Sequence, residues 1–402
     1  MSRLLVWTCL IAVLAAAACS SVSRDNSPHK NRVAERQRRR VTEYMALGEF
    51  AAAAAVLDSL TRERPSDSDL FELLGDAHLG AHHVDAAIKA YEQTIRLNYG
   101  AYTPHMKLGT LLMENGKTGR ALTEFELAVK ASDKDVLARY NYGVALYETG
   151  RHDEALQQWS IAAGIDHTNV RLAQALAMGY SGVNDSTAVA QFEHAHELGA
   201  DDAGFHNNYA LTLDRLGRDT DAEKQFEAAI EKAPAGKQVE YRRNFALHAL
   251  RTGHNEQAQH LFQDLVVSGG GLWSDTVYLA RADLALKQFD GAIGVLEPLA
   301  LDVESGKVPR SSARIDRMPP TLDEALDILG MSWRGKGDKQ RAVEYLKRAV
   351  ALSPDDPSHL NNYGVVLAEG GMLPEARKQW HRVLEIEPQN ATAKANLSAF
   401  GR

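Results

Sequence analysis

Two pairs of histidines are the first places where this sequence could hold a metal. His78 and His82 are four residues apart, so on a helix they would share one face, as zinc ligands do. His194 and His196 are two apart and would point to different sides of a helix. Neither pair belongs to an HExxH pattern, and a zinc site also needs third and fourth ligands. We therefore expect no metal site, and interpret His78 and His82 as a helix residue and a turn residue.

Two glycine-containing stretches imitate sites of phosphate binding or catalysis. The stretch ENGKTG at Glu114–Gly119 is similar to the end of a phosphate-binding loop, but Leu111 stands where that motif needs glycine. The stretch VSGGGLWS at Val267–Ser274 lacks the residue order of the GxSxG turn of hydrolases. Both are better explained as connections between helices. We expect no catalytic residue, cofactor or small-molecule substrate, and an enzyme built on a histidine face or a basic insert is the disfavoured alternative.

The first nineteen residues, MSRLLVWTCLIAVLAAAAC, have the features of an export signal. Arg3 precedes an apolar run, Leu4–Ala18, that would span roughly 22 Å as a helix, short of a hydrocarbon core of roughly 30 Å. Ala16–Ala18 would fit an ordinary cleavage site, which predicts a soluble periplasmic or secreted protein. The sequence AAAC is also similar to a bacterial lipobox, which implies that Cys19 becomes the lipidated first residue, and we favour this interpretation.

Cysteine usage and charge agree with an anchored protein that does not bind nucleic acid. The two cysteines are Cys9, inside the apolar run, and Cys19, so we expect the mature chain to form no internal disulfide. The formal net charge is −8 with both signs interspersed, which does not favour binding to nucleic acid. A basic run, AERQRRR at Ala34–Arg40, fits a solvated helix face or a weak attraction to anionic lipid headgroups.

A repeat with a spacing of mostly 34 residues organises the rest of the chain. Each unit has a small or short residue, an alanine twelve positions later, and a large apolar residue four positions after that. The first position holds Val41, Gly75, Gly109, Gly143, Leu176, Ala210, Ala246, Ala280, Gly330 and Gly364. The second holds Ala53, Ala87, Ala121, Ala155, Ala188, Ala222, Ala258, Ala292, Ala342 and Ala376. The third holds Leu57, Tyr91, Phe125, Trp159, Phe192, Phe226, Phe262, Leu296, Leu346 and Trp380.

This spacing predicts two short helices per unit, joined by a turn. The small residue and the alanine would let the two backbones approach, and the large residue would fill the space beside them. The turns would lie at Gly48, Gly116, Gly150, Gly217, Gly253, Gly337 and Gly371. Helices this short are marginal alone because nucleation is costly, so the units must stack on one another.

The pattern of Leu-Gly, alanine, aromatic residue and proline at this period resembles the tetratricopeptide repeat. The resemblance covers residues 32–389 and implies an all-α fold: a right-handed superhelical solenoid of about ten helix-turn-helix units. We expect a signal peptide at 1–18, a lipid anchor and flexible tether at 19–31, the solenoid at 32–389 and a capping helix at 390–402. In that last segment Asn390 fits a helix N-cap, and Leu397 and Phe400 would seal the final repeat.

In the family that the repeat resembles, the first helix of each unit lines a concave groove that accepts peptides or partner helices. The residue two positions before the small one would face that groove. Here this position gives a row of amide side chains: Asn141, Gln174, Asn208, Asn244 and Asn362. Amides both donate and accept hydrogen bonds, so the row could grip a peptide backbone, or each amide could only contact the neighbouring repeat. The predicted groove residues are Tyr140, Asn141, Tyr147, Gln174, Tyr180, Asn207, Asn208, Asp214, Arg215, Arg243, Asn244, Arg251 and Asn362.

An insertion of about sixteen residues, ESGKVPRSSARIDRMP at 304–319, interrupts the register. It is basic and could be a tolerated surface loop or a secondary contact site. After it, Thr321 and Glu324 have the spacing of a capping box that would restart the helix. The basic residues of the predicted contact loop are Lys307, Arg310, Arg314 and Arg317.

Together these features predict a protein-binding scaffold held at a membrane by an N-terminal lipid. We expect an outer-membrane lipoprotein of the bacterial envelope that faces the periplasm. Among tetratricopeptide lipoproteins it is similar to those that assist pilus or secretion-system assembly, such as Tad-type pilus lipoproteins and type IV pilotins. An adaptor for envelope hydrolases or for polysaccharide export is the alternative.

Overall fold

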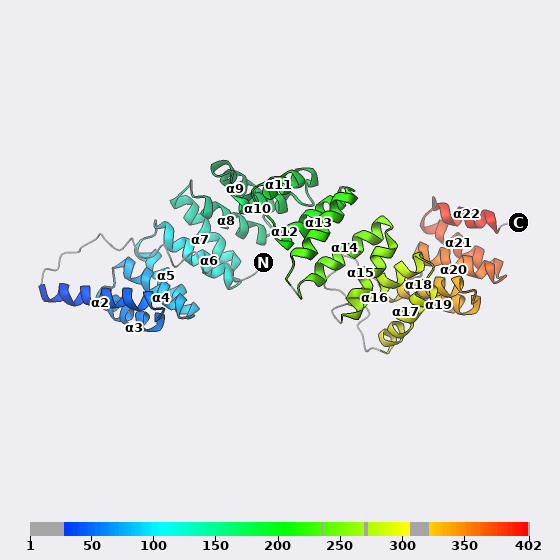
Figure 1. Ribbon diagram of the computed structural model, residues 1–402, viewed down its shortest axis with the longest axis horizontal. Coiled ribbons are helices and arrows are strands. Elements are labelled where there is room, and N and C mark those ends of the chain that lie inside the picture. The colour runs from blue at the N-terminus through cyan, green and yellow to red at the C-terminus, as the bar shows by residue number, and fades with distance from the viewer. Residues whose placement is uncertain (1–27, 235, 269–271, 306–320, 401–402) are drawn as a thin grey trace. The chain divides into compact units, whose positions relative to one another are not determined.

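The computed structural model describes residues 28–234, 236–268, 272–305 and 321–400, and within these ranges the chain folds into helices without a strand. The helices are short, mostly 13 or 14 residues, and follow one another closely (Figure 1). They are α2 (Pro28–Ala46), α3 (Phe50–Glu63), α4 (Ser68–Gly80), α5 (Val84–Leu97), α6 (Tyr102–Glu114), α7 (Thr118–Ala131), α8 (Val136–Glu148), α9 (His152–Ile165), α10 (Val170–Tyr180), α11 (Asp185–Glu197), α12 (Ala203–Arg215), α13 (Asp219–Lys232), α14 (Gln238–Thr252), α15 (Asn255–Val267), α16 (Trp273–Ala285), α17 (Phe289–Glu304), α18 (Leu322–Gly335), α19 (Lys339–Leu352), α20 (Pro357–Glu369), α21 (Leu373–Ile386) and α22 (Ala391–Ala399).

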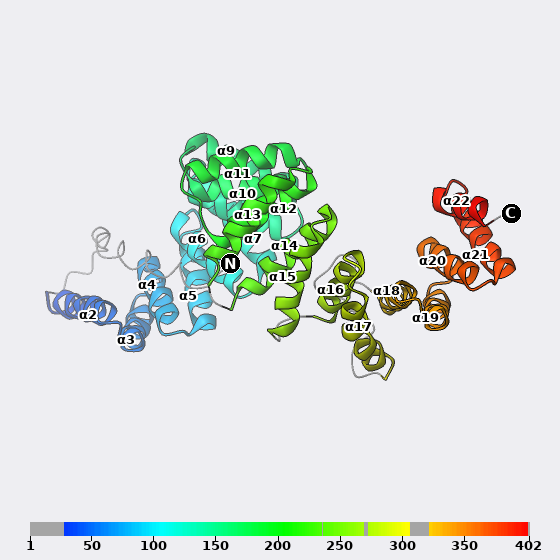
Figure 2. The same cartoon turned by 45° about the vertical axis from the view of Figure 1, so that its right-hand side comes forward.

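The chain divides into two compact units, residues 1–165 and 166–402. The first unit contains α2 to α9, and the second contains α10 to α22. In both units each even-numbered helix packs against the odd-numbered helix that follows it, and each such pair also packs against the next pair in its unit. The second unit ends with α20, α21 and α22 side by side, as Figure 1 and Figure 2 both show.

The repeat register predicted from the sequence is confirmed by burial. All ten alanines of the second position are completely inaccessible to solvent. The ten large residues of the third position are at most 3% exposed, including Tyr91, Trp159 and Trp380. A helix pair of this size has little apolar surface to bury, so the same three positions must form the core in every repeat.

The glycines of the first position are needed for the close approach of the two helices. A Cβ atom added to Gly75 would lie 2.5 Å from Cε1 of Tyr91, and one added to Gly143 would lie 2.6 Å from Cδ1 of Trp159. Real Cβ atoms essentially never come so near a neighbour. The aromatic ring therefore occupies the space that a side chain would need, and ring and glycine belong together in each of these repeats.

The turns between paired helices also lie where the sequence predicted them. Gly48, Gly116, Gly150, Gly217, Gly253, Gly337 and Gly371 have φ angles between 70 and 85°, the left-handed region that glycine adopts without strain. His82 and Lys287 occupy the same turn position in two other repeats and have φ angles of 60° and 59°. The interpretation of His82 as a turn residue is thus confirmed.

Helix α22 begins after Asn390, whose side-chain oxygen accepts a hydrogen bond of 2.9 Å from the backbone N–H of Ala393. Phe400 stacks on Trp380 with ring centroids 5.6 Å apart, and Leu397 packs into the same apolar cluster. The end of the last repeat is therefore covered by apolar side chains from this helix and the residue after it.

The predicted capping box at the start of α18 is wrong. Thr321 is the N-cap residue, but its side chain makes no capping hydrogen bond. The carboxylate of Glu324 instead forms an ion pair with Arg281 of α16, which lies in the preceding repeat. The side chain of Glu324 therefore pairs with the guanidinium of Arg281 and does not cap α18.

Several predicted features lie outside the described residues. These are the export signal, Cys19 and the tether up to residue 27, and the basic residues Lys307, Arg310, Arg314 and Arg317 of the insertion. Among the helices that the structure describes, none is both long enough and apolar enough to cross a membrane.

Candidate partner-binding surface

The predicted row of amides lies on the first helices of the repeats, and three of its positions share one arrangement. In each, the side chain two positions before the small residue donates to the side chain three positions before the small residue of the preceding repeat. Asn244 Nδ2 donates to Asn207 Oδ1 at 2.8 Å, and Asn362 Nδ2 donates to Asp327 Oδ2 at 2.9 Å. Lys107, which holds the same register position, donates to Glu72 Oε1 at 2.8 Å. These side chains hold neighbouring repeats together.

Lys107 pairs with two carboxylates of the preceding repeat. Its ammonium group also lies 2.8 Å from both carboxylate oxygens of Asp76, and Asp76 accepts a hydrogen bond of 2.7 Å from the hydroxyl of Tyr91. Burial alone would lower the pKa of Lys107, but the carboxylates of Asp76 and Glu72 outweigh it and raise that pKa. The ammonium therefore stays charged within the first unit.

Asn141 and Asn208 differ from these ties. The residue that would accept their hydrogen bond is apolar: Met106 for Asn141, and Ala173 for Asn208. Within the described part of the chain neither side-chain amide forms a hydrogen bond, and both residues are half-buried rather than enclosed. Asn141 lies on α8 in the first unit and Asn208 on α12 in the second. Both the donor and the acceptor of these two row amides are thus available to a partner.

Gln174 is a weaker case. Its Nε2 atom lies 3.4 Å from Oδ2 of Asp202, the N-cap residue of α12. That distance is at the long end for a hydrogen bond, so the amide is only loosely held. Gln174 is therefore intermediate between the tied and the unbonded amides.

Two predicted groove residues lie beneath the surface instead of on it. Arg243 is 5% exposed and forms a bidentate ion pair with Asp275 of α16, at 2.8 and 2.9 Å. Asn207 is also 5% exposed and accepts the hydrogen bond from Asn244. Because internal partners and burial take up both side chains, our expectation that they face a partner is corrected: they support the surface from inside.

The three predicted tyrosines are all half-buried. In the first unit, the backbone carbonyl of Tyr140 accepts a hydrogen bond of 3.1 Å from the indole of Trp159. The ring of Tyr147 makes edge contact with His152, with centroids 4.5 Å apart. In the second unit, Tyr180 packs against the apolar cluster that contains Phe192. Each tyrosine thus contributes to packing and leaves part of its surface to solvent.

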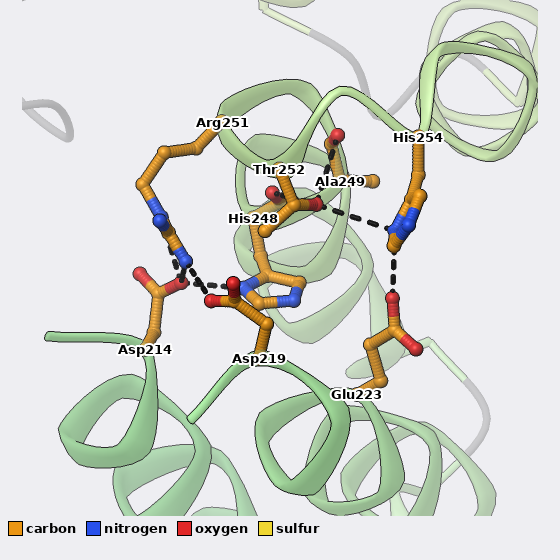
Figure 3. A network of polar contacts seen from close by, with 8 residues as sticks. All are labelled: Asp214, Asp219, Glu223, His248, Ala249, Arg251, Thr252 and His254. Atoms are coloured by element: carbon orange, nitrogen blue, oxygen red, sulfur yellow. Dashed lines mark hydrogen bonds and ion pairs between the residues drawn. The ribbon is translucent and has the colours of Figure 1, made fainter. Parts of the chain in front are cut away.

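A network of charged side chains joins the ends of α12 and α14 (Figure 3). Asp214 accepts hydrogen bonds from Nδ1 of the buried His248 and from Nε of Arg251 at 3.0 Å. Arg251 also pairs with Asp219 at the start of α13. Burial would raise the pKa of Asp214, but the bonds from His248 and Arg251 outweigh it and hold that pKa below its usual value.

The same network is the one place in the described chain where ligand atoms of three potential metal ligands all lie within 4.8 Å of one another. The three residues are Asp214, Asp219 and His248. Figure 3 shows the guanidinium of Arg251 against both carboxylates, so the position of a cation is already taken by this side chain. The geometry favours an inter-repeat tie. The predicted groove residues Asp214 and Arg251 therefore form an ion pair with each other, and Arg251 remains partly exposed.

Arg215 is held in a similar way one repeat earlier. Its guanidinium bonds to both carboxylate oxygens of Asp185, at 2.8 and 2.9 Å, and to the hydroxyl of Ser181 at 2.6 Å. The bonds join the end of α12 to the turn between α10 and α11. Arg215 remains exposed, so the ion pair fixes its orientation at the surface.

Sequence reasoning missed several members of these ties. Lys107, Asp327 and His248 were not singled out, although Lys107 stands at the row position and Asp327 three positions before Gly330. Comparing adjacent register positions between successive repeats would have paired Lys107 with Glu72 and Asn362 with Asp327. His248 has no such signal, since its partner Asp214 is 34 residues away at a different register position.

Comparison with known proteins identifies the repeat. The tetratricopeptide repeat family matches residues 38–101, 73–136, 106–163 and 329–391. A curated relative, the small glutamine-rich tetratricopeptide repeat-containing protein 2 of Mycosarcoma maydis, is 26% identical over 144 residues. That alignment covers 35% of this chain and 41% of the relative, so the chain spans less than half of the relative's length.

Solved structures give similar but partial matches. The C-terminal part of a tetratricopeptide repeat protein from Cytophaga hutchinsonii matches 57% of this chain and 94% of its own, with 17% identity and a TM-score of 0.47. PilF of Pseudomonas aeruginosa matches 51% of this chain and 93% of its own, with 17% identity and a TM-score of 0.43. The family matches agree with the repeat inferred from the register: residues 38–163 and 329–391 match the tetratricopeptide repeat, and the described part of the chain is all-α.

Proposed function

We propose that the chain is a scaffold that binds a segment of a partner protein on the first helices of its repeats. The repeat family supports protein binding as the class of function. The observation that carries the proposal is the contrast within the row: Asn244 and Asn362 are tied to the preceding repeat, whereas Asn141 and Asn208 are not. An unbonded amide can donate to and accept from a peptide backbone whatever the partner's side chains are.

The surroundings of Asn208 suit such a contact. Arg215, on the same helix, is exposed and held in orientation by Asp185. Arginine and tyrosine are enriched at the centres of protein interfaces, and Tyr180 of α10, the first helix of the preceding repeat, is half-buried. A partner segment on the second unit would therefore meet one amide, one oriented guanidinium and one aromatic ring.

Cys19 would determine where in the cell the scaffold is located. We propose that Cys19 carries lipid, and that the protein assists the assembly of an envelope complex such as a pilus or secretion apparatus, facing the periplasm from the outer membrane. What supports this part is the sequence AAAC and the apolar run before it. Several acyl chains on Cys19 would give durable anchoring, which a single chain would not.

Partner binding is tested by comparing two row amides, one without an internal hydrogen bond and one with such a bond. A photo-crosslinking residue at position 211, one helical turn from Asn208, would report capture of a partner in cells. We expect Asn208→Ala to reduce capture with little loss of stability, and Asn244→Ala to lower stability because it removes the bond to Asn207. If Asn208→Ala leaves capture unchanged, the proposed role of this amide fails.

The test of anchoring is separate. We expect Cys19→Ser to release the protein from the outer-membrane fraction and to remove the mass of the acyl chains. Unchanged mass and unchanged fractionation would refute lipidation while leaving the partner-binding surface intact.

A further inference from the structure

A cavity of about 320 Å³ lies in the second unit, between the first turn of α20 and the start of α22. Its wall includes Ser358, Asn361 and Asn362 from α20, and Glu387 and Asn390 from the segment that leads into α22. None of its lining residues is lysine or arginine. The cavity is thus lined mainly by amide, hydroxyl and carboxylate groups.

The hydrogen bonds inside the wall fix which end of each amide remains available. Asn390 Oδ1 accepts from the backbone of Ala393, so the group that Asn361 turns toward it, at 3.4 Å, must be Nδ2. Asn361 Oδ1 is then left without a partner among the described residues, and Asn361 is 6% exposed. Asn362 Nδ2 likewise faces the carboxylate of Asp327, which can only accept. Asn362 therefore directs its hydrogens toward Asp327 and leaves its oxygen available at the wall, whereas Asn361 donates across the wall to Asn390 and its own oxygen is buried.

The charges around the cavity favour a cation. His359, next to Asn361 on α20, lies 3.2 Å from Asp323, 3.3 Å from Asp327 and 3.9 Å from Asp356. Three carboxylates therefore surround one imidazole, and Glu387 adds a fourth carboxylate at the cavity itself. Even with His359 protonated, negative charge exceeds positive charge in this region.

The two helix starts beside the cavity do not reverse this balance. The carboxylate of Asp356 accepts from the backbone N–H groups of Ser358, at 2.8 Å, and His359, at 3.0 Å. Pro357 has no N–H to offer. At α22, Asn390 caps the N–H of Ala393. Most of the backbone donors that would attract an anion at these ends are already bonded.

We propose that this cavity binds a primary ammonium group, presented by a lysine side chain of a partner segment. An ammonium group has three donors and no acceptor, which complements Asn362 Oδ1, the Ser358 hydroxyl and the Glu387 carboxylate. Glu387 Oε2 already accepts from Asn390 Nδ2 at 2.7 Å, so the other carboxylate oxygen, Oε1, would meet the ammonium group. The long apolar stem of lysine would lie against Pro357 at the cavity edge. This inference does not depend on the role proposed for Asn141 and Asn208, which lie on other helices.

Binding is tested on the full chain with the peptide acetyl-Ala-Ala-Lys-Ala-Ala-amide and a counterpart that carries norleucine in place of lysine. We expect titration calorimetry to detect the lysine peptide alone, and the side-chain amide NMR signals of Asn361 and Asn362 to shift. Glu387→Gln should weaken binding about fivefold, the equivalent of one exposed charge pair. Equal affinity for the two peptides would overturn the proposal, as would sodium acetate shifting the same signals. If butylammonium binds as tightly as the peptide, the cavity recognises a small amine, and the proposal that a partner's lysine supplies the ammonium group is wrong.

Two controls separate this site from general effects. Glu385→Gln removes an exposed carboxylate that pairs with Arg382 on α21, and we expect it to leave binding unchanged. Asn362→Ala and Asn244→Ala each remove a row amide tied to the preceding repeat, so we expect similar losses of stability. Only Asn362→Ala, and independently Ser358→Ala, should weaken binding of the lysine peptide. Wild-type affinity in both of these variants would refute the site.

Discussion

Replacing Gly143 by alanine tests whether the close approach of paired helices stabilises the repeats. The added Cβ atom would lie 2.6 Å from Cδ1 and 2.8 Å from Cε2 of Trp159, whose indole donates to the carbonyl of Tyr140 at 3.1 Å. Overpacking of a core costs about 1–3 kcal/mol, and losing the indole bond costs about 0.5–1.5 kcal/mol more. Alanine regains about 1 kcal/mol as the better helix former. We therefore expect a net loss of about 0.5–3.5 kcal/mol in the free energy of unfolding.

Gly164→Ala is the matched control, because Gly164 lies in α9 of the same repeat and a Cβ atom there would meet nothing within 4 Å. It should leave stability unchanged or raise it by up to about 1 kcal/mol. Long repeat arrays need not unfold in two states, so the assay is hydrogen exchange of the α8 and α9 amides alongside urea unfolding. If Gly143→Ala slows exchange as its control does, the ring of Trp159 has room to move and the reasoning is wrong.

Three further outcomes follow from particular residues. Lys287 has a left-handed backbone, so Lys287→Gly should raise the urea midpoint, because removing the Cβ atom there is worth about 1 kcal/mol. Lys336 has an ordinary right-handed backbone, so Lys336→Gly should not raise the midpoint. Arg243→Ala should lower the free energy of unfolding by about 3–5 kcal/mol, because it leaves the buried carboxylate of Asp275 without its guanidinium partner. A loss of only a few tenths of a kcal/mol, about the size of an exposed pair, would contradict this. Burial lowers the pKa of His359, but Asp327, Asp356 and Asp323 outweigh it and raise that pKa to about 9. The stabilisation from protonated His359 should therefore be complete below its unfolded pKa of about 6.5 and disappear as pH rises through 9, which hydrogen exchange of α20 in wild type and His359→Gln would show.

The fold could be predicted from sequence because its determinants recur at fixed spacing. Each repeat needs a small residue, an alanine and a large residue in register, and the chain carries ten copies of this pattern, so a chance match at one repeat is outweighed by the other nine. The left-handed turns were predictable for the same reason, since glycine is the residue that adopts them without strain. The start of α18 was not, because Glu324 can cap its own helix or pair with Arg281, and only the position of Arg281 decides between them.

The surface was harder to predict because a polar side chain has several possible partners. Asn208 and Asn244 occupy identical register positions, yet among the described residues the first amide has no hydrogen-bond partner and the second is bonded to Asn207. Arg243 was expected at the surface for its residue type, whereas Asp275, 32 residues later, draws it inside. Charge pairing between repeats depends on the identities of two residues at once, and the repeat pattern itself constrains neither.

Two register positions, two and three residues before the small residue, together explain how the repeats can contribute to both stability and binding. Where the position three before the small residue is polar, as at Glu72 and Asp327, the row residue of the next repeat is bonded to it and stabilises the stack. Where it is apolar, as at Met106 and Ala173, the row amide keeps its hydrogen-bonding capacity for solvent or a partner. The apolar residue costs the stack one tie, but the buried alanine and ring of each repeat still hold the helices together. A repeat protein of this kind can therefore change its binding surface by single substitutions at the acceptor position without altering the core that defines its fold.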